Sequence, residues 1–347
     1  MTSKTVLRII DANFNRAREA MRVIEEYCRF VLDHKGLCAR TKQLRHALCS
    51  ALSGLDNLQL LACRDTAGDV GTDLKVDQQL TRTSLESCLT AAAKRLPEAL
   101  RALSELIQTF DPVLAARVEQ IRYQAYTLEK DIAVLGLPLV KYGRVRLYVL
   151  VTSDSSAEVL RLTDQCARGG ADCIQWRAKQ LSDKKRVEIG RAFVSVCAES
   201  DAVSIINDRV DIAVATGADG VHLGGDDLPV HEARALQSAP LIIGKTTHDL
   251  QELAEAAEDQ PTYVALGPAF ATPTKPELRA AGLGYIRDGL EKIGGQDLGH
   301  VVIGGITEAN LDQVLDAGAK TIAVCSAVTH APDPAEACRH LKERLSQ

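Results

Sequence analysis

The first 135 residues carry apolar side chains at helical spacing. Steps of four and three residues separate the apolar positions of two stretches: Ala17, Met21, Ile24, Cys28 and Val31, then Leu114, Val118, Ile121, Ala125, Leu128 and Ile132. This spacing places apolar side chains on one face of a helix and charges on the others. Further helices are predicted near 38–53, 79–96 and 97–109. We therefore predict an all-α domain over 1–135.

A different pattern begins at residue 146, where short apolar runs alternate with helical stretches. Eight runs end in glycine or polar residues: 146–152, 172–177, 202–207, 219–224, 240–245, 262–267, 300–305 and 321–326. Continuous apolar runs fit parallel strands covered on both faces, and their alternation with helices indicates βα units. Eight units predict an α/β fold with a (β/α)8 TIM barrel over 146–347, after a linker at 136–145. A doubly wound open sheet is the alternative, although no GxGxxG follows the first run.

Composition and charge support the same boundary and exclude several classes of protein. Residues 1–140 hold 5 of the 24 glycines, and with 19 Lys+Arg and 17 Asp+Glu they have a net charge of +2; the remainder has −7. Neither half has the concentrated basic field of a nucleic-acid-binding protein. No apolar run approaches the roughly 20 residues of a membrane helix, and the first residues lack a secretion signal. We expect a cytoplasmic protein with no nucleic-acid or membrane partner.

Ten cysteines are scattered along the chain, and no two form a CxxC pair. This spacing supports neither a zinc ribbon nor a redox motif. Thiols stay reduced in the cytoplasm and pack as small apolar groups. We therefore expect buried, unpaired cysteines.

Polar residues follow the second, third and fourth runs, where barrel enzymes place their active sites. Gln175, Arg177 and Lys179 alternate at the end of the second run and would share one face, which suits a polyanion or is ordinary surface charge. Asp208 follows the third run and Asp227 the fourth. Mg²⁺ binds one or two carboxylates plus substrate phosphates, so this end of the barrel predicts a Mg²⁺-assisted pyrophosphate site. The alternative role for each aspartate is a helix N-cap.

A second anion site is predicted after the sixth, seventh and eighth runs. The loop that ends in Lys275 is rich in hydroxyl groups, and Gly305 and Ser326 follow the last two runs. Loops in these places of a barrel often bind phosphate through backbone N–H groups, and glycine permits the close approach. His248, after the fifth run, is either catalytic or structural.

The motifs together resemble one family. From about Leu147 to Gln347, the chain is similar to thiamine-phosphate synthase, also called thiamine-phosphate pyrophosphorylase. The resemblance is carried, in the family's order, by QWRAK, NDR, HLGGDDLP, GPAFATPTK, IGGIT and the turn at Ser326. Two positions depart from the family pattern. Gly225 stands where the family usually has Gln, next to the metal carboxylates, and Trp176 replaces a smaller apolar residue.

The resemblance implies the reaction. The family joins 4-amino-2-methyl-5-(diphosphooxymethyl)pyrimidine to 4-methyl-5-(2-phosphooxyethyl)thiazole, which gives thiamine phosphate and pyrophosphate. Pyrophosphate leaves first, and the thiazole nitrogen then attacks the pyrimidine methylene cation. A related thiazole tautomerase or regulatory barrel is the alternative, because such relatives retain the phosphate turn without needing the carboxylates and cations of the diphosphate site.

The resemblance also implies the residue roles. Arg177, Lys179 and Lys275 would be catalytic, and Asp208 and Asp227 would bind Mg²⁺. The residues implied to bind the two small-molecule substrates are Gln175, Trp176, Arg177, Ala178, Lys179, Asn207, Thr246, Thr272, Pro273, Thr274, Lys275, Gly305, Cys325 and Ser326. Cys325 would be a structural or backbone contact, not a nucleophile.

The helical region, with DANFNRAREAMRVIEEY and TKQLRH, resembles extra N-terminal regions of some bacterial synthases. Such regions have been linked to the preceding phosphorylation of the pyrimidine, although no P-loop is present here. Seven polar residues could form a pocket: Asn13, Arg16, Arg45, His46, Arg64, Asp65 and Asp69. The alternative is a solvated face with the pairs Arg22–Glu26 and Glu25–Arg29, on a docking or dimerisation module. A homo-oligomer is possible.

Overall fold

The computed structural model describes residues 3–71, 81–237, 239–272 and 279–346. The chain divides into two compact units, Met1–Gly136 and Leu137–Gln347. Each unit is described by itself.

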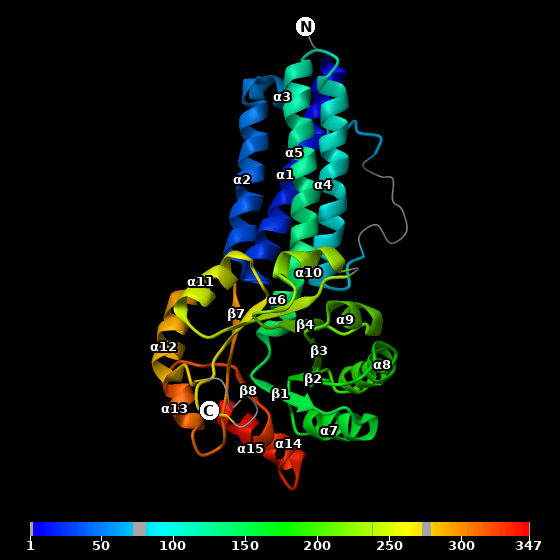
Figure 1. Cartoon of the computed structure of the whole chain (residues 1–347). Helices are drawn as coiled ribbons and strands as arrows, with labels where there is room; N and C mark the ends of the chain where they lie inside the picture. Colours follow the sequence, from blue (N-terminus) through cyan, green and yellow to red (C-terminus); the bar gives the residue numbers. More distant parts are fainter. Residues whose placement is uncertain (1–2, 72–80, 238, 273–278, 347) are drawn as a thin grey trace. The chain divides into compact units, whose positions relative to one another are not determined.

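The first unit is built of helices (Figure 1). In chain order they are α1 (Lys4–Phe30), α2 (Lys35–Ala51), the short η1 (Leu52–Gly54), α3 (Asn57–Cys63), α4 (Leu85–Ile107), α5 (Pro112–Asp131) and η2 (Ile132–Gly136). Side chains of Ser3, Asp56, Ser84 and Asp111 accept hydrogen bonds from the first backbone N–H groups of α1, α3, α4 and α5. Helix α1 packs against α2, α3 and α4, and its apolar stripe forms the core of the unit.

Helix α4 corrects one prediction from the sequence. We expected separate helices at 79–96 and 97–109, but α4 runs without a break through Pro97. Proline removes one backbone hydrogen bond inside a helix. Here Pro97 is buried between Leu96 and Leu100, and the apolar face that packs against α1 and α5 continues on both sides of it. Packing of this face outweighs the local cost. Residues 79 and 80 lie outside the described residues.

The charged residues of the first unit form ion pairs that differ from the predicted ones. Glu25 is buried and pairs with Arg45 (Nε–Oε2, 3.0 Å) and Arg22 (3.4 Å), not with Arg29. Asp11, also buried, accepts two 2.8 Å hydrogen bonds from the Arg64 guanidinium. Buried carboxylates that each have a cation favour the structural interpretation of these residues over a ligand pocket.

Replacing Glu119 is expected to destabilise the first unit in a pH-dependent way. Two hydrogen bonds from Arg122 hold the pKa of Glu119 at about 2, below its usual 4.5. Because the folded-state pKa is depressed, the stabilisation is fully present above about pH 4.5 and is lost as the pH falls towards 2. Glu119→Gln should therefore cost about 1 kcal/mol of unfolding free energy at pH 7, and progressively less as the pH falls from 4.5.

Urea unfolding followed by circular dichroism at pH 7 and pH 3 measures this difference. Glu98→Gln, an exposed position on α4, is the control and should change stability little at either pH. An equal loss at both pH values would show that the ion pair does not account for the effect.

The second unit is a closed barrel of eight parallel strands in the order β1 to β8, which confirms the predicted fold and excludes the open sheet. The strands are β1 (Leu147–Thr152), β2 (Cys173–Arg177), β3 (Val203–Asn207), β4 (Gly220–Leu223), β5 (Ile242–Thr247), β6 (Tyr263–Leu266), β7 (Gly299–Ile303) and β8 (Ile322–Val324). Each of the eight apolar runs provides one of them.

Helices surround the barrel and cover its outer face (Figure 1). They are α7 (Ser156–Arg168), α8 (Asp183–Glu199), α9 (Val210–Thr216), α10 (Val230–Leu236), α11 (Leu250–Glu258), α12 (Gly282–Ile293), α13 (Leu311–Asp316), α14 (Ser326–Thr329) and α15 (Pro334–Leu345). Alternate strand residues such as Val149, Ile174 and Val221 point outwards and pack under these helices in the largest buried cluster. The other residues point inwards.

The segment 136–145, predicted as a linker, is helical over Leu137–Gly143, which we call α6. Its Tyr142 is buried and stacks on Tyr263 of β6, with ring centroids 4.1 Å apart. Tyr148 of β1 meets the same ring edge-on at 6.0 Å. The three tyrosines fill the barrel interior beside Ile205 and Val301, so part of the expected linker belongs to the barrel core.

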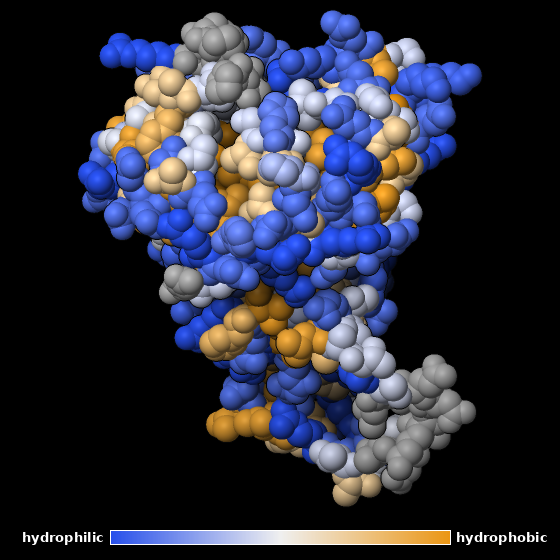
Figure 2. Space-filling model, turned by 90° about the horizontal axis from the view of Figure 1, so that it is seen from below, coloured by the Kyte–Doolittle hydropathy of each residue, from blue (hydrophilic) through white to orange (hydrophobic). Residues whose placement is uncertain are grey.

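None of the ten cysteines, all within the described residues, forms a disulfide, and six of them are buried. The face shown in Figure 2 is covered mainly by hydrophilic residues, with the hydrophobic ones in smaller patches. Among the described residues, no helix has the length and apolar character that crossing a membrane requires.

Candidate active site

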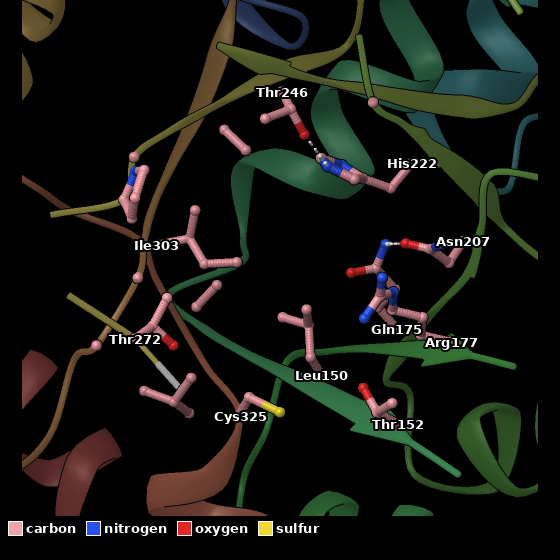
Figure 3. A pocket seen from close by; sticks show the side chains of 18 of the residues that line it. Leu150, Thr152, Gln175, Arg177, Asn207, His222, Thr246, Thr272, Ile303 and Cys325 are labelled. Carbon is pink, nitrogen blue, oxygen red and sulfur yellow. Dashed lines mark hydrogen bonds between the residues drawn. The ribbon is translucent and has the colours of Figure 1, made fainter. Parts of the chain in front are cut away.

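A cavity of about 480 Å³ lies at the carboxyl ends of the barrel strands, within the range that small-molecule ligands occupy. Its walls come from the ends of the strands and the loops that follow them (Figure 3). Ten predicted site residues line it: Gln175, Arg177, Asn207, Asp208, Asp227, Thr246, Thr272, Gly305, Cys325 and Ser326. Residues that are far apart in the sequence therefore meet at the carboxyl ends of the strands, where the sequence analysis predicted a site.

One wall holds amide and guanidinium groups. Because side chains alternate along β2, Gln175 and Arg177 both point into the barrel. Gln175 is only 2% exposed, and its Nε2 donates to Asn207 Oδ1 at the end of β3 (3.1 Å). Figure 3 shows the three side chains close together on this wall. The arrangement offers a cation and amide donors to an anionic ligand.

The same alternation corrects the prediction for Trp176. Its indole is 2% exposed, packs outwards near Phe193 of α8 (ring centroids 6.2 Å apart) and donates from Nε1 to the Ser153 carbonyl. Trp176 lies between Gln175 and Arg177 on β2, so its side chain faces the helices instead of the cavity. It therefore contributes to packing.

The other predicted substrate-binding residues either do not line the cavity or lie outside the described residues. Ala178 and Lys179 follow β2 and are not among the lining residues; Lys179 is exposed, and its backbone N–H donates to Asp154 Oδ1 (2.8 Å). The predicted residues Pro273, Thr274 and Lys275 lie outside the described residues.

The two predicted metal carboxylates line the cavity from neighbouring loops. Asp208 has a left-handed backbone (φ 63°), and its N–H donates to the His222 carbonyl (2.8 Å), which ties the end of β3 to β4. Asp227 Oδ2 accepts from Gly224 N–H (2.6 Å) across the loop after β4. The N-caps of the helices that follow, α9 and α10, are Arg209 and Pro229. The aspartates therefore do not serve as helix caps.

The loops after β6, β7 and β8 form the opposite wall. Gly304 and Gly305 have positive φ (107° and 63°), and a Cβ on Gly305 would lie 2.6 Å from the Ala271 carbonyl oxygen. Phe270 N–H donates to the Gly304 carbonyl at 3.0 Å. Glycine is needed here because the two loops pass so closely. Together with Cys325 and Ser326, this backbone lines the cavity.

His248 lines the rim of the cavity, and its Nδ1 lies 2.9 Å from Glu252 Oε2 on the following helix. The His248 backbone N–H also donates to Glu252, at 2.8 Å. These contacts support a structural role, and the catalytic interpretation stays untested.

Several polar residues of the cavity were not among the predicted site residues, and two of them, His222 and Thr152, lie inside strands. His222, on β4, lies 2.8 Å (Nε2) from Thr246 Oγ1 and 2.9 Å (Nδ1) from the Tyr263 hydroxyl. The Thr152 hydroxyl oxygen is buried at the end of β1 and has no hydrogen-bond partner among the described residues. Both were detectable as polar residues inside apolar strands, each one residue from positions that face the helices, such as Val151 and Val221. A ligand or a water in the cavity can supply the hydrogen bond that the Thr152 hydroxyl does not make within the described residues.

Comparison with known proteins agrees with this geometry. Residues 147–328 match the family model of thiamine monophosphate synthase. A thiamine-phosphate synthase of Synechocystis sp. is 38% identical over 99% of this chain and 97% of its own length. The chain belongs to the thiamine-phosphate synthase family. Membership of this family makes it a transferase.

Other relatives of the thiamine-phosphate synthase family extend the comparison. The enzyme of Rhodopirellula baltica is 38% identical over 94% of this chain and 89% of its own length. The solved thiamine phosphate pyrophosphorylase of Pyrococcus furiosus is 34% identical, covers 58% of this chain and 96% of its own, and has a TM-score of 0.53. Residues 8–131 match the model of the ThiD2 family, so the first unit has a family of its own.

Proposed function

We propose that the barrel makes thiamine phosphate from 4-amino-2-methyl-5-(diphosphooxymethyl)pyrimidine and 4-methyl-5-(2-phosphooxyethyl)thiazole, with release of pyrophosphate. The observation that carries the proposal is the composition of the cavity. Arg177, Asp208 and Asp227 lie on one side, and the close backbone of Gly305 and the turn at Ser326 on the other. Two anionic substrates need two such anion sites in one cavity. A thiazole tautomerase would not need the carboxylates.

Asp208 and Asp227 suit Mg²⁺ as a donor set. Mg²⁺ keeps several waters and takes one or two carboxylates together with substrate phosphates. In the described parts of the chain, no group of three or more His, Cys, Asp or Glu side chains is arranged to hold a metal. We assign Asp208 and Asp227 as the two protein ligands, and the diphosphate would complete the shell. When bound, the ion would neutralise charge on the leaving pyrophosphate.

The residues of the cavity would act by position and charge. The bond between the methylene carbon and the diphosphate oxygen breaks, and its electron pair leaves with pyrophosphate beside Arg177. The amino-pyrimidine delocalises the methylene cation. The thiazole nitrogen then forms the new bond and becomes the cationic thiazolium, so no proton transfer and no protein nucleophile are needed. We assign Lys179 and Lys275 to the same diphosphate as further cations.

The second wall would hold the thiazole phosphate. Gly304 and Gly305 let a phosphate approach the backbone, and the loop to Ser326 closes the same side. The unpaired Thr152 hydroxyl, on the adjoining β1, supplies one more polar contact in the cavity. The thiazole ring would then lie between the phosphate turn and the pyrimidine.

A turnover assay tests the proposal. Purified protein is incubated with both substrates and Mg²⁺, and the product is oxidised to fluorescent thiochrome. We expect product with Mg²⁺ and a loss of at least about 100-fold when EDTA removes the ion, because a bound metal provides several kcal/mol of charge stabilisation. Reactions without protein, and EDTA reactions to which Mg²⁺ is restored, are the controls. Folded protein that gives no product would overturn the proposed function, and turnover unaffected by EDTA would overturn the metal assignment.

A further inference from the structure

A chain of hydrogen-bonded polar groups runs from the half-buried Thr246 and His222 at the cavity to two buried tyrosines in the barrel interior. Thr246 Oγ1 is 2.8 Å from His222 Nε2, and His222 Nδ1 is 2.9 Å from the Tyr263 hydroxyl. The Tyr263 hydroxyl is in turn 2.9 Å from the Tyr148 hydroxyl. The four groups come from β5, β4, β6 and β1, and only Thr246 and His222 line the cavity. Figure 3 shows the hydrogen bond between these two residues.

In each of these hydrogen bonds, the stronger donor and the stronger acceptor decide which group gives the proton. A neutral imidazole nitrogen is a better acceptor than a phenol oxygen, and a phenol O–H is a better donor than an imidazole N–H. Tyr263 therefore donates to His222 Nδ1, and its oxygen accepts from Tyr148. With Nδ1 accepting, the proton of the neutral imidazole lies on Nε2, which donates to Thr246 Oγ1.

Burial keeps this direction fixed. Tyr148 and Tyr263 are fully buried, which raises the pKa of each hydroxyl well above 10, so both stay protonated. The Tyr263 ring cannot turn away, because Tyr142 stacks on one face of it and Gly244 lies against it. A fully satisfied buried network of this kind rigidifies the groups at its end.

We propose that Tyr148 and Tyr263 are positioning residues that hold His222 as the Nε2–H tautomer and so aim the Thr246 hydroxyl proton into the cavity, towards an acceptor atom of the pyrimidine diphosphate. Since Thr246 Oγ1 already accepts from His222, its own proton is the group it can give to a ligand. The ligand must then present a hydrogen-bond acceptor at this place, which the pyrimidine diphosphate can do. The inference rests on the proposed function, because it assigns Thr246 to the pyrimidine substrate.

Five variants test it, of which the fifth, Thr246→Ser, keeps the hydroxyl group. Tyr263→Phe removes the hydroxyl and keeps the ring stacking, and Thr246→Val removes the proposed donor at equal volume. The double variant combines them. Tyr142→Phe is the matched control: it also removes one hydroxyl from the tyrosine cluster, but that hydroxyl makes only a 3.5 Å contact with the His300 carbonyl. For each protein, kcat and KM for the pyrimidine diphosphate are measured at saturating thiazole phosphate.

Tyr263→Phe is expected to lower kcat/KM about tenfold, the usual effect of leaving one buried acceptor unpaired, and Tyr142→Phe to stay within about twofold. Thr246→Val is expected to lose as much or more. The decisive result is the double variant, which should match Thr246→Val alone, because Tyr263 acts only through Thr246. Thr246→Ser should retain most activity.

Two outcomes would overturn the inference: no loss in Tyr263→Phe, or losses that multiply in the double variant, as a purely structural role of Tyr263 predicts. The fluorescence of Trp176, the single tryptophan of the chain, checks that each variant keeps a folded barrel. An absence of turnover in the unmodified protein would instead count against the proposed function, so the two failures are distinguishable.

Discussion

Asp208→Asn is expected to lower Mg²⁺-dependent turnover by about 100-fold or more while the protein stays folded. Asparagine is the right replacement because Asp208 has a left-handed backbone, which asparagine tolerates and alanine does not. The backbone hydrogen bond from Asp208 to the His222 carbonyl is retained. The change therefore removes one negative charge from the cavity and little else.

The same variant should also need more Mg²⁺. If Asp208 holds the ion, the Mg²⁺ concentration for half-maximal turnover should rise about tenfold or more. Asp164→Asn is the matched control: it removes a carboxylate from α7 that pairs with Arg168 at 2.9 Å, on the exposed face of a helix. Its turnover and Mg²⁺ requirement should not change. A drop in turnover for Asp208→Asn with an unaltered Mg²⁺ requirement would contradict the metal assignment and leave a purely electrostatic role.

The sequence predicted the barrel well because its signal is repeated eight times. Each buried strand is a continuous apolar run that ends in glycine or a polar residue, and the structure turns each run into one strand. The two misread places both contain proline. Pro138 lies in α6, which follows η2 without a break, and Pro97 lies in α4, so in both places the helical backbone continues through a proline. The local tendency of proline to end a helix was outweighed by tertiary contacts, which cannot be read from the sequence.

The cavity could be predicted only as far as strand-end residues reveal it. Arg177, Asp208 and Asp227 can be recognised from the sequence because charged residues at the ends of buried strands are typical of barrel active sites. Trp176 was included because it lies within a continuous motif, whereas alternation on β2 turns it outwards. Tyr263 and His222 were missed for the opposite reason. They look like core residues of apolar strands, and only closure of the barrel places them against each other.

Gly244→Ala is expected to destabilise the barrel by about 3 kcal/mol, the upper end of the usual cost of overpacking a filled core. A Cβ at this position would lie 2.1 Å from Cζ and 2.4 Å from the hydroxyl of Tyr263, and 2.6 Å from Nδ1 of His222. None of these atoms can move freely. Tyr263 is stacked on Tyr142, and its hydroxyl is bonded to His222 and Tyr148. The methyl group must therefore displace the tyrosine or spread β5 from its neighbours.

Urea unfolding followed by the fluorescence of Trp176 measures the effect, because this side chain is buried between β2 and α8 and reports on the barrel alone. Gly284→Ala is the control. It adds the same methyl group on the exposed side of α12, where no atom would lie within 4 Å, and should leave stability unchanged or slightly increased.

At urea concentrations where Gly244→Ala remains folded, its kcat/KM should fall at least as far as that of Tyr263→Phe, because the same hydrogen bond to His222 is displaced. The prediction is contradicted if Gly244→Ala is as stable and active as the Gly284→Ala control. The barrel interior would then accommodate an added methyl group. Hydrogen bonds through such a deformable core could not hold Thr246 in one orientation.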